Sequence, residues 1–450
     1  MSSVVFKRKI YAEMLAWKQR QGTKTALLIE GARRIGKSTI AETFAKNEYQ
    51  DYILIDFAQA DAETLELFNH VSRLDYFFVR LQSYFGKTLK PGKSVIIFDE
   101  IQLYPKARQA IKYLVKDGRY DYIETGSLLS IKKNVKDILI PSEEHRINMY
   151  PLDFEEFLWT QDKAQTYDFI RQMYDTLTPA GESMHRLLMR EFRLYMLVGG
   201  MPQAVAAYLK HHDFTSVDEA KRGIIALYNE DLRKMDEKGR ASTIFNSIPA
   251  ELSRGKLRYQ VGSVIPNSRP SRLDEIFTDL RESKTVNFAF HANDPSVGLA
   301  LHTHYDHFKM YLADTGLFIT LAFMDKSYTD NEIYRKLLSD KLPADLGYIF
   351  ENVVAQMLQS AGNALYYHTF KEKASETAEP RTYEIDFLVG YKDKICPIEV
   401  KSSGYKTHKS LDMFQQKYAS RIHRRFLLST KDLRKEKDLI CLPVYMASLL

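Results

Sequence analysis

Short apolar runs alternate with longer amphipathic stretches in the first part of the chain. Helical spacing occurs at residues 38–46, 61–86 and 105–117, after an amphipathic segment within residues 1–25. The four runs between them are almost wholly apolar, which is typical of strands buried on both faces: Thr25–Glu30, Asp51–Asp56, Ser94–Asp99 and Tyr120–Thr125. This alternation predicts a parallel sheet covered by helices on both faces. In such a sheet we expect the fourth strand to lie beside the second.

The pattern changes after Pro151. Residues 151–235 carry mostly helical spacing, broken at Gly199–Pro202, and the segments between about 246 and 330 are shorter and mixed. A helix at residues 346–360 then precedes further strands and a basic helix. We therefore expect four domains: an α/β core at 1–165, a helical segment at 166–245, a segment of winged-helix character at 246–335 and a second α/β domain at 336–450.

The composition is that of a globular protein and excludes several other classes. Hydrophobic residues make up 45% of the 450 residues and charged residues 27%, which is enough for several cores. The only cysteines are Cys396 and Cys441, which excludes a disulfide scaffold or a multi-cysteine zinc site. No apolar run approaches the ~20 residues that a membrane helix needs, and Met1–Ile10 lacks an apolar signal core. We expect a cytoplasmic protein without a membrane partner.

Gly31–Ser38 matches the phosphate-binding pattern G-x-x-x-x-G-K-[ST] in full. Its glycines allow the tight turn that points backbone N–H groups inward, and the N-terminus of the next helix completes an anion cradle. We expect Lys37 to reach the β- and γ-phosphates of ATP, and the Ser38 hydroxyl to bind Mg²⁺. The predicted nucleotide-binding residues are Gly31, Ala32, Arg33, Arg34, Ile35, Gly36, Lys37, Ser38, Thr39 and Thr125.

A second motif supports ATP hydrolysis. Val95–Glu100 is an apolar strand that ends in two acids, and a buried parallel strand delivers its last residues to the edge of the sheet where ligands bind. Asp99 is expected to hold Mg²⁺, and Glu100 to polarise the attacking water. Thr125 ends the fourth strand with Gly126 and Ser127, where a hydroxyl either senses the γ-phosphate or caps the following helix. Arg146 is a candidate for an arginine supplied to a neighbouring copy.

These motifs resemble those of prokaryotic AAA-type ATPases of the archaeal-ATPase-like group. The resemblance covers nearly the whole chain, through the segments Gly31–Thr39, Phe98–Gln102, Thr125–Ser127, Tyr150–Phe157, Gly199–Pro202, Lys309–Gly316 and Glu399–Lys401. It implies an α/β fold with a P-loop AAA-type parallel sheet, a helical lid, a winged-helix-like middle and a nuclease-like C-terminal domain. A biological role does not follow from it.

The C-terminal part carries a third set of polar residues. Two strands flank a turn at Lys392–Lys394, which places Asp386 opposite Glu399 or Val400 and puts Lys401 on the face of Glu399. With Glu351 on the preceding helix, these residues resemble the PD-(D/E)xK nuclease motif. In that interpretation Asp386, Glu399 and Lys401 are catalytic and Glu351, Asp386 and Glu399 bind Mg²⁺. The alternative is an edge hairpin with solvent-facing charges.

Residues 401–437 contain eleven Lys or Arg against three acids, an excess that would suit a phosphate backbone or a solvated basic helix. Two hypotheses therefore stay open. The first is an ATP-dependent enzyme or regulator that acts on DNA or RNA. The second is a nucleotide-switched signalling or scaffold protein without cleavage activity. Besides ATP and DNA or RNA, the partners that we expect are a second copy of the chain or an unknown protein. A toxin-like or defence factor is a third class.

Overall fold

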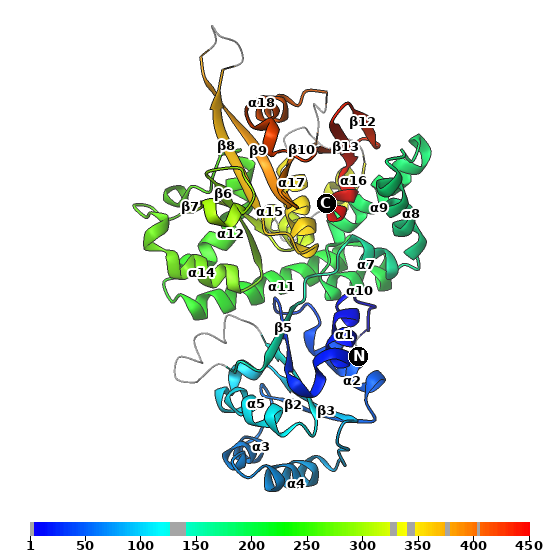
Figure 1. The fold of residues 1–450 in the computed structure, drawn as a ribbon, viewed down its shortest axis with the longest axis vertical. Coiled ribbons are helices and arrows are strands. Elements are labelled where there is room, and N and C mark those ends of the chain that lie inside the picture. Colours follow the sequence, from blue (N-terminus) through cyan, green and yellow to red (C-terminus); the bar gives the residue numbers. More distant parts are fainter. Residues whose placement is uncertain (1–3, 127–140, 325–330, 340–346, 374–378, 403–405) are drawn as a thin grey trace. The chain divides into compact units, whose positions relative to one another are not determined.

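The computed structural model describes residues 4–126, 141–324, 331–339, 347–373, 379–402 and 406–450 (Figure 1). The chain forms two compact units. The first contains the residues up to Tyr150 together with Glu282–Lys284, and the second contains Pro151–Arg281 and Thr285–Leu450. Ser127, which we expected beside the nucleotide, lies outside the described residues.

The first unit is built on a five-stranded sheet in which every pair of neighbours is parallel, as the sequence predicts. Its order is β2-β3-β4-β1-β5. The strands are β1 Ala26–Glu30, β2 Asp51–Asp56, β3 Ser94–Asp99, β4 Asp121–Gly126 and β5 Glu144–Asn148. The expectation that β4 lies beside β2 is wrong, because β4 pairs with β3 on one side and β1 on the other. The end of β4 therefore lies between the ends of β1 and β3.

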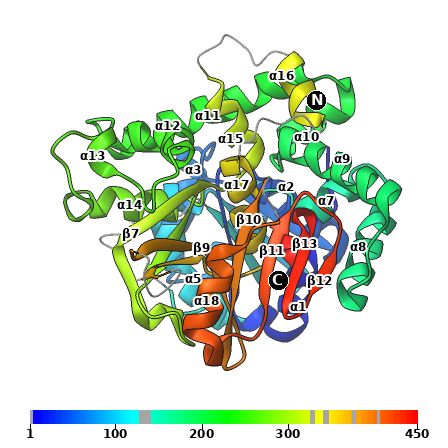
Figure 2. The same ribbon diagram turned by 90° about the horizontal axis from the view of Figure 1, so that it is seen from above.

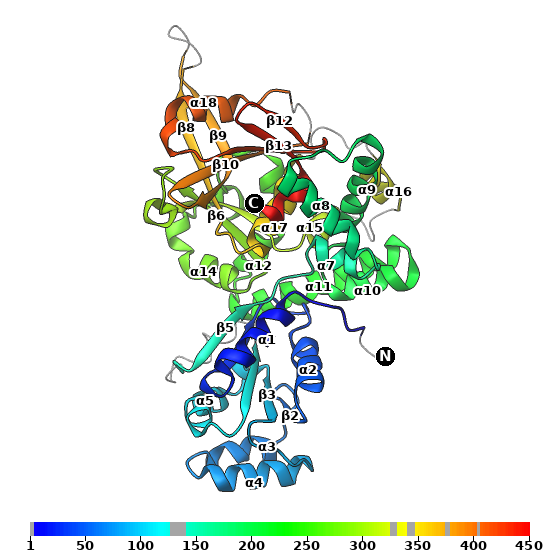
Figure 3. The ribbon, with the colours of Figure 1, turned by 45° about the vertical axis from the view of Figure 1, so that its right-hand side comes forward.

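Helices lie on the sheet of the first unit (Figure 3). They are α1 Ile10–Gln21, α2 Lys37–Glu48, α3 Ala62–Leu67, α4 Leu74–Phe85 and α5 Pro105–Asp117. An aromatic core joins α4 and α5 to the sheet, where Phe77 and Phe78 are buried with Phe98 and Tyr122. Helix α2 packs across β2, β3 and β4. The predicted layered α/β core is confirmed.

The second unit contains a mixed eight-stranded sheet of order β12-β13-β11-β10-β9-β8-β6-β7 (Figure 2). Its strands are β6 Val286–Ala292, β7 Thr303–Leu312, β8 Tyr366–Glu372, β9 Arg381–Tyr391, β10 Lys394–Lys401, β11 Arg425–Ser429, β12 Arg434–Glu436 and β13 Leu439–Pro443. Strand β6 pairs with β8 in parallel and with β7 antiparallel. The expected boundary between 335 and 336 therefore falls within one sheet, because β6 and β8 pair although a long segment separates them in sequence.

The helices of the second unit are α7 Phe154–Trp159, α8 Ala164–Thr176, α9 Glu182–Val198, α10 Pro202–His211, α11 Phe214–Met235, α12 Arg240–Ser253, α13 Val261–Val264, α14 Asp274–Glu282, α15 Thr315–Ala322, α16 Asn331–Leu338, α17 Gly347–Ser360 and α18 Lys409–Tyr418. Helix α18 packs on the sheet through Leu411 and Phe414. Helix α17 packs against β6, β7 and β10. The helices expected as a lid over the nucleotide belong to this second compact unit, and the lid role stays a prediction.

Two of the segments that carry the family resemblance, Gly199–Pro202 and Lys309–Gly316, contact each other in the structure. The backbone N–H of Gly200 donates to Asp314 Oδ2 at 2.6 Å, and Leu317 N donates to Asp314 Oδ1 at 2.8 Å. A Cβ on Gly316 would lie 2.6 Å from the Cα of Gly199, which is too close for any side chain. The two segments need glycine because their backbones touch, so these motifs maintain the packing of α9 against α15.

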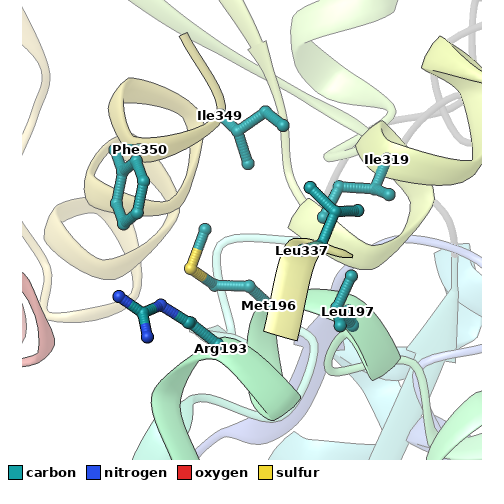
Figure 4. A pocket seen from close by; sticks show the side chains of 7 residues that line it. All are labelled: Arg193, Met196, Leu197, Ile319, Leu337, Ile349 and Phe350. Atoms are coloured by element: carbon teal, nitrogen blue, oxygen red, sulfur yellow. The ribbon is translucent and has the colours of Figure 1, made fainter. Parts of the chain in front are cut away.

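Residues of α9, α15, α16 and α17 surround a small pocket of about 10 Å³ (Figure 4). Its lining is Arg193, Met196, Leu197, Ile319, Leu337, Ile349 and Phe350. A volume of this size holds about one water molecule at most. The pocket is therefore a packing gap in the helical layer and has no room for a ligand.

Candidate functional site

The phosphate-binding loop lies between β1 and α2, the context that the sequence motif requires. Strand β1 ends at Glu30, and α2 begins at Lys37. Two loop residues have left-handed backbones, Arg34 with φ 69° and Gly36 with φ 95°. Gly36 therefore suits its position just before the helix, since glycine adopts this conformation without steric cost.

Close packing holds the start of the loop in place. A Cβ on Gly31 would lie 2.4 Å from both the carbonyl oxygen of Met149 and Ile35 Cδ1. Arg8 braces the loop from the N-terminal side, where Nη1 donates to the Ile35 carbonyl at 3.0 Å and Nη2 to the Tyr150 carbonyl at 2.5 Å. Arg8 is 7% exposed. Sequence reasoning missed Arg8, because nothing in its local pattern distinguishes it from other surface arginines.

Lys37 is folded back over its own loop. Its Nζ donates to the carbonyl oxygens of Gly31 at 3.0 Å and Ala32 at 2.9 Å. The side chain is buried, and this burial lowers the pKa of Lys37, while the carboxylates of Glu100 and Asp99 oppose the shift. The ammonium therefore rests on neutral carbonyls within the electrostatic field of two acids.

A hydrogen-bonded group of three side chains joins the ends of α2, β3 and β4. Ser38 Oγ donates to Asp99 Oδ1 at 2.7 Å, and Thr125 Oγ1 donates to the same carboxylate oxygen. Thr125 is fully buried. It reaches Asp99 because β4 lies between β1 and β3 in the sheet. The predicted metal ligands Ser38 and Asp99 thus meet, and their oxygens are of the kind that Mg²⁺ prefers.

Glu100 follows directly and has a left-handed backbone, with φ 53°. Its N–H donates to Thr125 Oγ1 at 3.3 Å, and its carboxylate Oε2 accepts a hydrogen bond from Gln102 Nε2. Gln102 is almost fully buried, so it holds the carboxylate in one orientation. Gln102 ends the family segment Phe98–Gln102, but its local sequence pattern predicts no role for it.

In the second unit, the predicted hairpin forms at the expected turn. Lys394 pairs with Tyr391 and Ile398 with Phe387, and Lys392 in the turn has φ 52°. Asp386 Oδ2 accepts a hydrogen bond from the Val400 backbone N–H at 2.7 Å. The register that places Asp386 opposite Glu399 or Val400 is therefore confirmed. Lys401 Nζ lies 3.2 Å from Glu399 Oε1, so these two side chains form an ion pair.

Two further charged residues, Lys309 and Glu384, lie close to Glu351. Lys309 on β7 forms an ion pair with Glu384 on β9, and its Nζ lies 3.8 Å from Glu351 Oε2. Burial, reinforced by the nearby Glu351 charge, raises the pKa of Asp386 well above its ordinary value. Burial also raises the pKa of Glu399, although Lys401 opposes this shift. Lys309 opens the quoted segment Lys309–Gly316, but the sequence does not indicate its pairing with Glu384, which lies 75 residues further along the chain.

Comparison with known proteins gives a family match for the segment that contains the first site. Residues 23–158 match the family model described as "AAA domain". The match covers most of the first unit, which we call the AAA domain. Two further matches carry no functional information: residues 189–328 match a domain of unknown function (DUF8612), and residues 346–446 match another (DUF4143). A search of the curated proteins finds no match.

Three solved structures are similar to the chain over part of its length. The Walker-type ATPase PABY2304 of Pyrococcus abyssi is 17% identical, with a TM-score of 0.42 over 70% of this chain and 96% of that one. Cdc6p of Pyrobaculum aerophilum is 13% identical, with a TM-score of 0.26 over 76% and 98%. RuvB of Thermotoga maritima is 13% identical, with a TM-score of 0.28 over 62% and 89%. At such TM-scores the whole-chain likeness carries no argument, so the family match and the site geometry carry the assignment.

The arginines near the P-loop of the AAA domain differ in their surroundings. Arg33 and Arg34 are both exposed on the loop. Arg146 lies on β5, where it pairs with Glu144 at 3.0 Å and Glu30 at 3.7 Å. Its charge is thus already engaged within the AAA domain, and its role toward a neighbouring copy stays a prediction.

Several of the basic residues in 401–437 form ion pairs, so the excess of positive charge in this segment is partly neutralised. Arg425 is buried between Asp412 and Asp438, at 2.9 and 2.8 Å. Of the other basic residues in 401–437, ion pairs also engage Lys401, Lys417, Arg421 and Arg434. Among the described residues, no three His, Cys, Asp or Glu side chains come together so as to hold a metal ion. The metal-binding roles of Glu351, Asp386 and Glu399 therefore stay predictions.

No helix in the described ranges is both long and apolar enough to cross a membrane.

Proposed function

We propose that the AAA domain binds ATP with Mg²⁺ and hydrolyses the γ-phosphate bond. One observation carries this proposal: the Ser38 hydroxyl donates to Asp99 at 2.7 Å, at the same edge of the sheet as Lys37 and Glu100. A phosphate-binding loop, a metal-binding pair and an acid able to activate water are the parts that phosphoryl transfer to water requires.

Each side chain has a distinct task in this proposal. The backbone N–H groups of the loop and the Lys37 ammonium would bind the phosphates, because both present positive charge to an anion. Ser38 and Asp99 would hold Mg²⁺, which neutralises charge on the phosphates when bound. Glu100 would accept a proton from the attacking water, and Gln102 would keep its carboxylate in position. Thr125 would fix the orientation of Asp99.

Two substitutions separate binding from turnover. We expect Lys37→Ala to abolish most ATP binding, measured by titration with a fluorescent nucleotide, because it removes the buried ammonium. Glu100→Gln should retain binding and lose turnover by about a hundredfold or more, the usual contribution of a general base. Lys24→Ala, which removes an exposed lysine outside the loop, serves as a control for charge loss. Normal turnover in Glu100→Gln would remove Glu100 from its proposed role.

For the second unit we propose a nuclease-like domain whose contact with DNA or RNA depends on the nucleotide state of the AAA domain. The expected order of a helix, a run of strands and a second helix is present as α17, β8–β10 and α18, which supports a nuclease-like fold. The exposed lysines that remain on α18 and its flanks support contact with phosphates. ATP turnover measured with single-stranded DNA, duplex DNA and RNA tests this coupling. Turnover unaffected by all three would favour the signalling or scaffold alternative.

A further inference from the structure

A lysine lies at the centre of the carboxylate cluster of the second unit. Contacts join Lys309 and Tyr311 from β7, Glu384 from β9 and Glu351 from α17, and Asp386 on β9 lies close enough for its charge to act on Lys309. Lys309 Nζ forms an ion pair with Glu384 and lies 3.8 Å from Glu351 Oε2, which also accepts from the Tyr311 hydroxyl at 3.5 Å. The three carboxylates come from two separate elements, so the ammonium of a third element joins them electrostatically.

Lys309 is buried, so its charge must be compensated by the carboxylates around it. Its side chain is only 8% exposed, and its ammonium lies 5.6 Å from the centroid of the Tyr367 ring, on a third strand. An ammonium in such a place is costly unless carboxylates compensate its charge. The converse also holds, because Glu351, Glu384 and Asp386 would repel one another without a cation between them. The lysine and the acids therefore depend on each other.

We propose that the Lys309 ammonium is the resident cation of this cluster and occupies the place that a divalent metal would need. A metal ion could enter only by displacing Lys309 from Glu384 and leaving a buried ammonium beside a dication, which is strongly unfavourable. If the second unit contacts nucleic acid as proposed above, it therefore does not cleave it at Asp386. This inference deepens the function proposed for the second unit and is independent of ATP hydrolysis by the AAA domain.

Terbium luminescence tests the proposal on the unaltered, nucleotide-free chain, because Tyr311 in the cluster and Tyr367 beside it would sensitise a lanthanide bound there. We expect wild type and Asp386→Asn to give the same Tb³⁺ signal, since no ion enters the cluster in either. A wild-type signal that Asp386→Asn removes would overturn the proposal, whatever the fate of other variants.

Removal of the ammonium should convert the cluster into a metal site. In Lys309→Met we expect Tb³⁺ and Mn²⁺ binding to tighten by about tenfold or more, because a unit positive charge a few ångströms from the ion is lost. The double variant Lys309→Met with Asp386→Asn should lose the gain, and Lys309→Arg, which keeps the charge, should show none. A folded Lys309→Met chain, verified by circular dichroism, that binds Tb³⁺ no better than wild type would contradict the proposal.

Cleavage is the second readout. We expect no nicking of supercoiled plasmid by wild type in Mg²⁺ or Mn²⁺. Nicking that both Lys401→Ala and Asp386→Asn abolish would show an active metal site and overturn the proposal. ATP turnover by Lys309→Met, measured on the same preparation, reports on the AAA domain alone, so failure of the ATPase proposal is distinguished from failure of this one.

Discussion

The Thr125 hydroxyl offers the sharpest test of how the sheet order builds the ATPase site. Thr125→Val keeps the shape of the side chain and removes one hydroxyl. In the structure that hydroxyl donates to Asp99 Oδ1 and accepts from the Glu100 N–H at 3.3 Å. Because Thr125 is fully buried, water cannot replace the lost donor. Asp99 keeps its second donor, Ser38, so the carboxylate would be loosened and not released.

The size of the effect expected for Thr125→Val follows from the charge of the Asp99 carboxylate, which accepts the hydrogen bond. A hydrogen bond to a charged group contributes about 1.5–3 kcal/mol. If Thr125 orients Asp99 for Mg²⁺, most of this free energy is lost from Mg²⁺ binding. The Mg²⁺ concentration that gives half-maximal turnover should then rise by roughly ten- to a hundredfold. Steady-state ATPase rates measured over a Mg²⁺ titration give this value directly.

Thr125→Ser is the matched control, because it restores the hydroxyl and removes only a methyl group. We expect Thr125→Ser to stay close to wild type in its Mg²⁺ dependence. Turnover and Mg²⁺ dependence of Thr125→Val within about twofold of wild type, in a chain of unchanged thermal stability, would refute the reasoning, since twofold corresponds to well under 1 kcal/mol. A loss of stability without a change in Mg²⁺ dependence would assign Thr125 a purely structural role.

Two further predictions address the loop and the pH dependence. Arg8→Ala should weaken ATP binding by about tenfold, because the loop loses a charged donor 3.0 Å from the Ile35 carbonyl; unchanged affinity in a nucleotide titration would exclude Arg8 as a brace. Burial lowers the pKa of His368 to about 4, although the hydrogen bond to the Ala292 carbonyl opposes the shift. The unfolded chain therefore binds more protons between about pH 6.5 and 4, so this residue should reduce stability as pH falls through that range. His368→Asn should flatten the slope of urea-unfolding free energy there, and an unchanged slope would contradict the shift.

In the proposed ATPase site, the parts whose positions the sequence predicted are those with contiguous residues. Gly31–Thr39 follows β1 and the pair Asp99–Glu100 lies at the end of β3, so a local pattern predicts their position at the sheet edge. Strand and helix periodicity likewise predicted the layered α/β core. The sheet order could not be obtained in this way, because it depends on which strands pair across long segments, and local periodicity carries no such information.

The remaining residues were missed for the same physical reason. Arg8 reaches Ile35 and Tyr150 across 27 and 142 residues, and Lys309 reaches Glu384 across 75. Arg8 lies in the short basic run Lys7–Lys9, and Lys309 opens one of the quoted family segments. Neither local pattern indicates a distant partner, and only the fold brings that partner close. The placement of β6 and β7 could not be predicted for the same reason. Their local sequence suggested a separate segment, whereas β6 pairs with the distant strand β8.

Two of the buried lysines, Lys37 and Lys309, show why similar residues serve different purposes in the two units. Lys37 donates to two neutral carbonyls, Gly31 and Ala32, at 3.0 and 2.9 Å. A phosphate that binds there would replace these neutral acceptors with negatively charged oxygens. Hydrogen bonds to charged acceptors are stronger, so the replacement is favourable. Lys309 is already paired with carboxylates, and an anion or metal that enters would have to break ionic contacts in a buried site. The partners of each ammonium therefore determine whether its site is open to a ligand, which is why ATP should bind at Lys37 while the cluster around Lys309 stays closed.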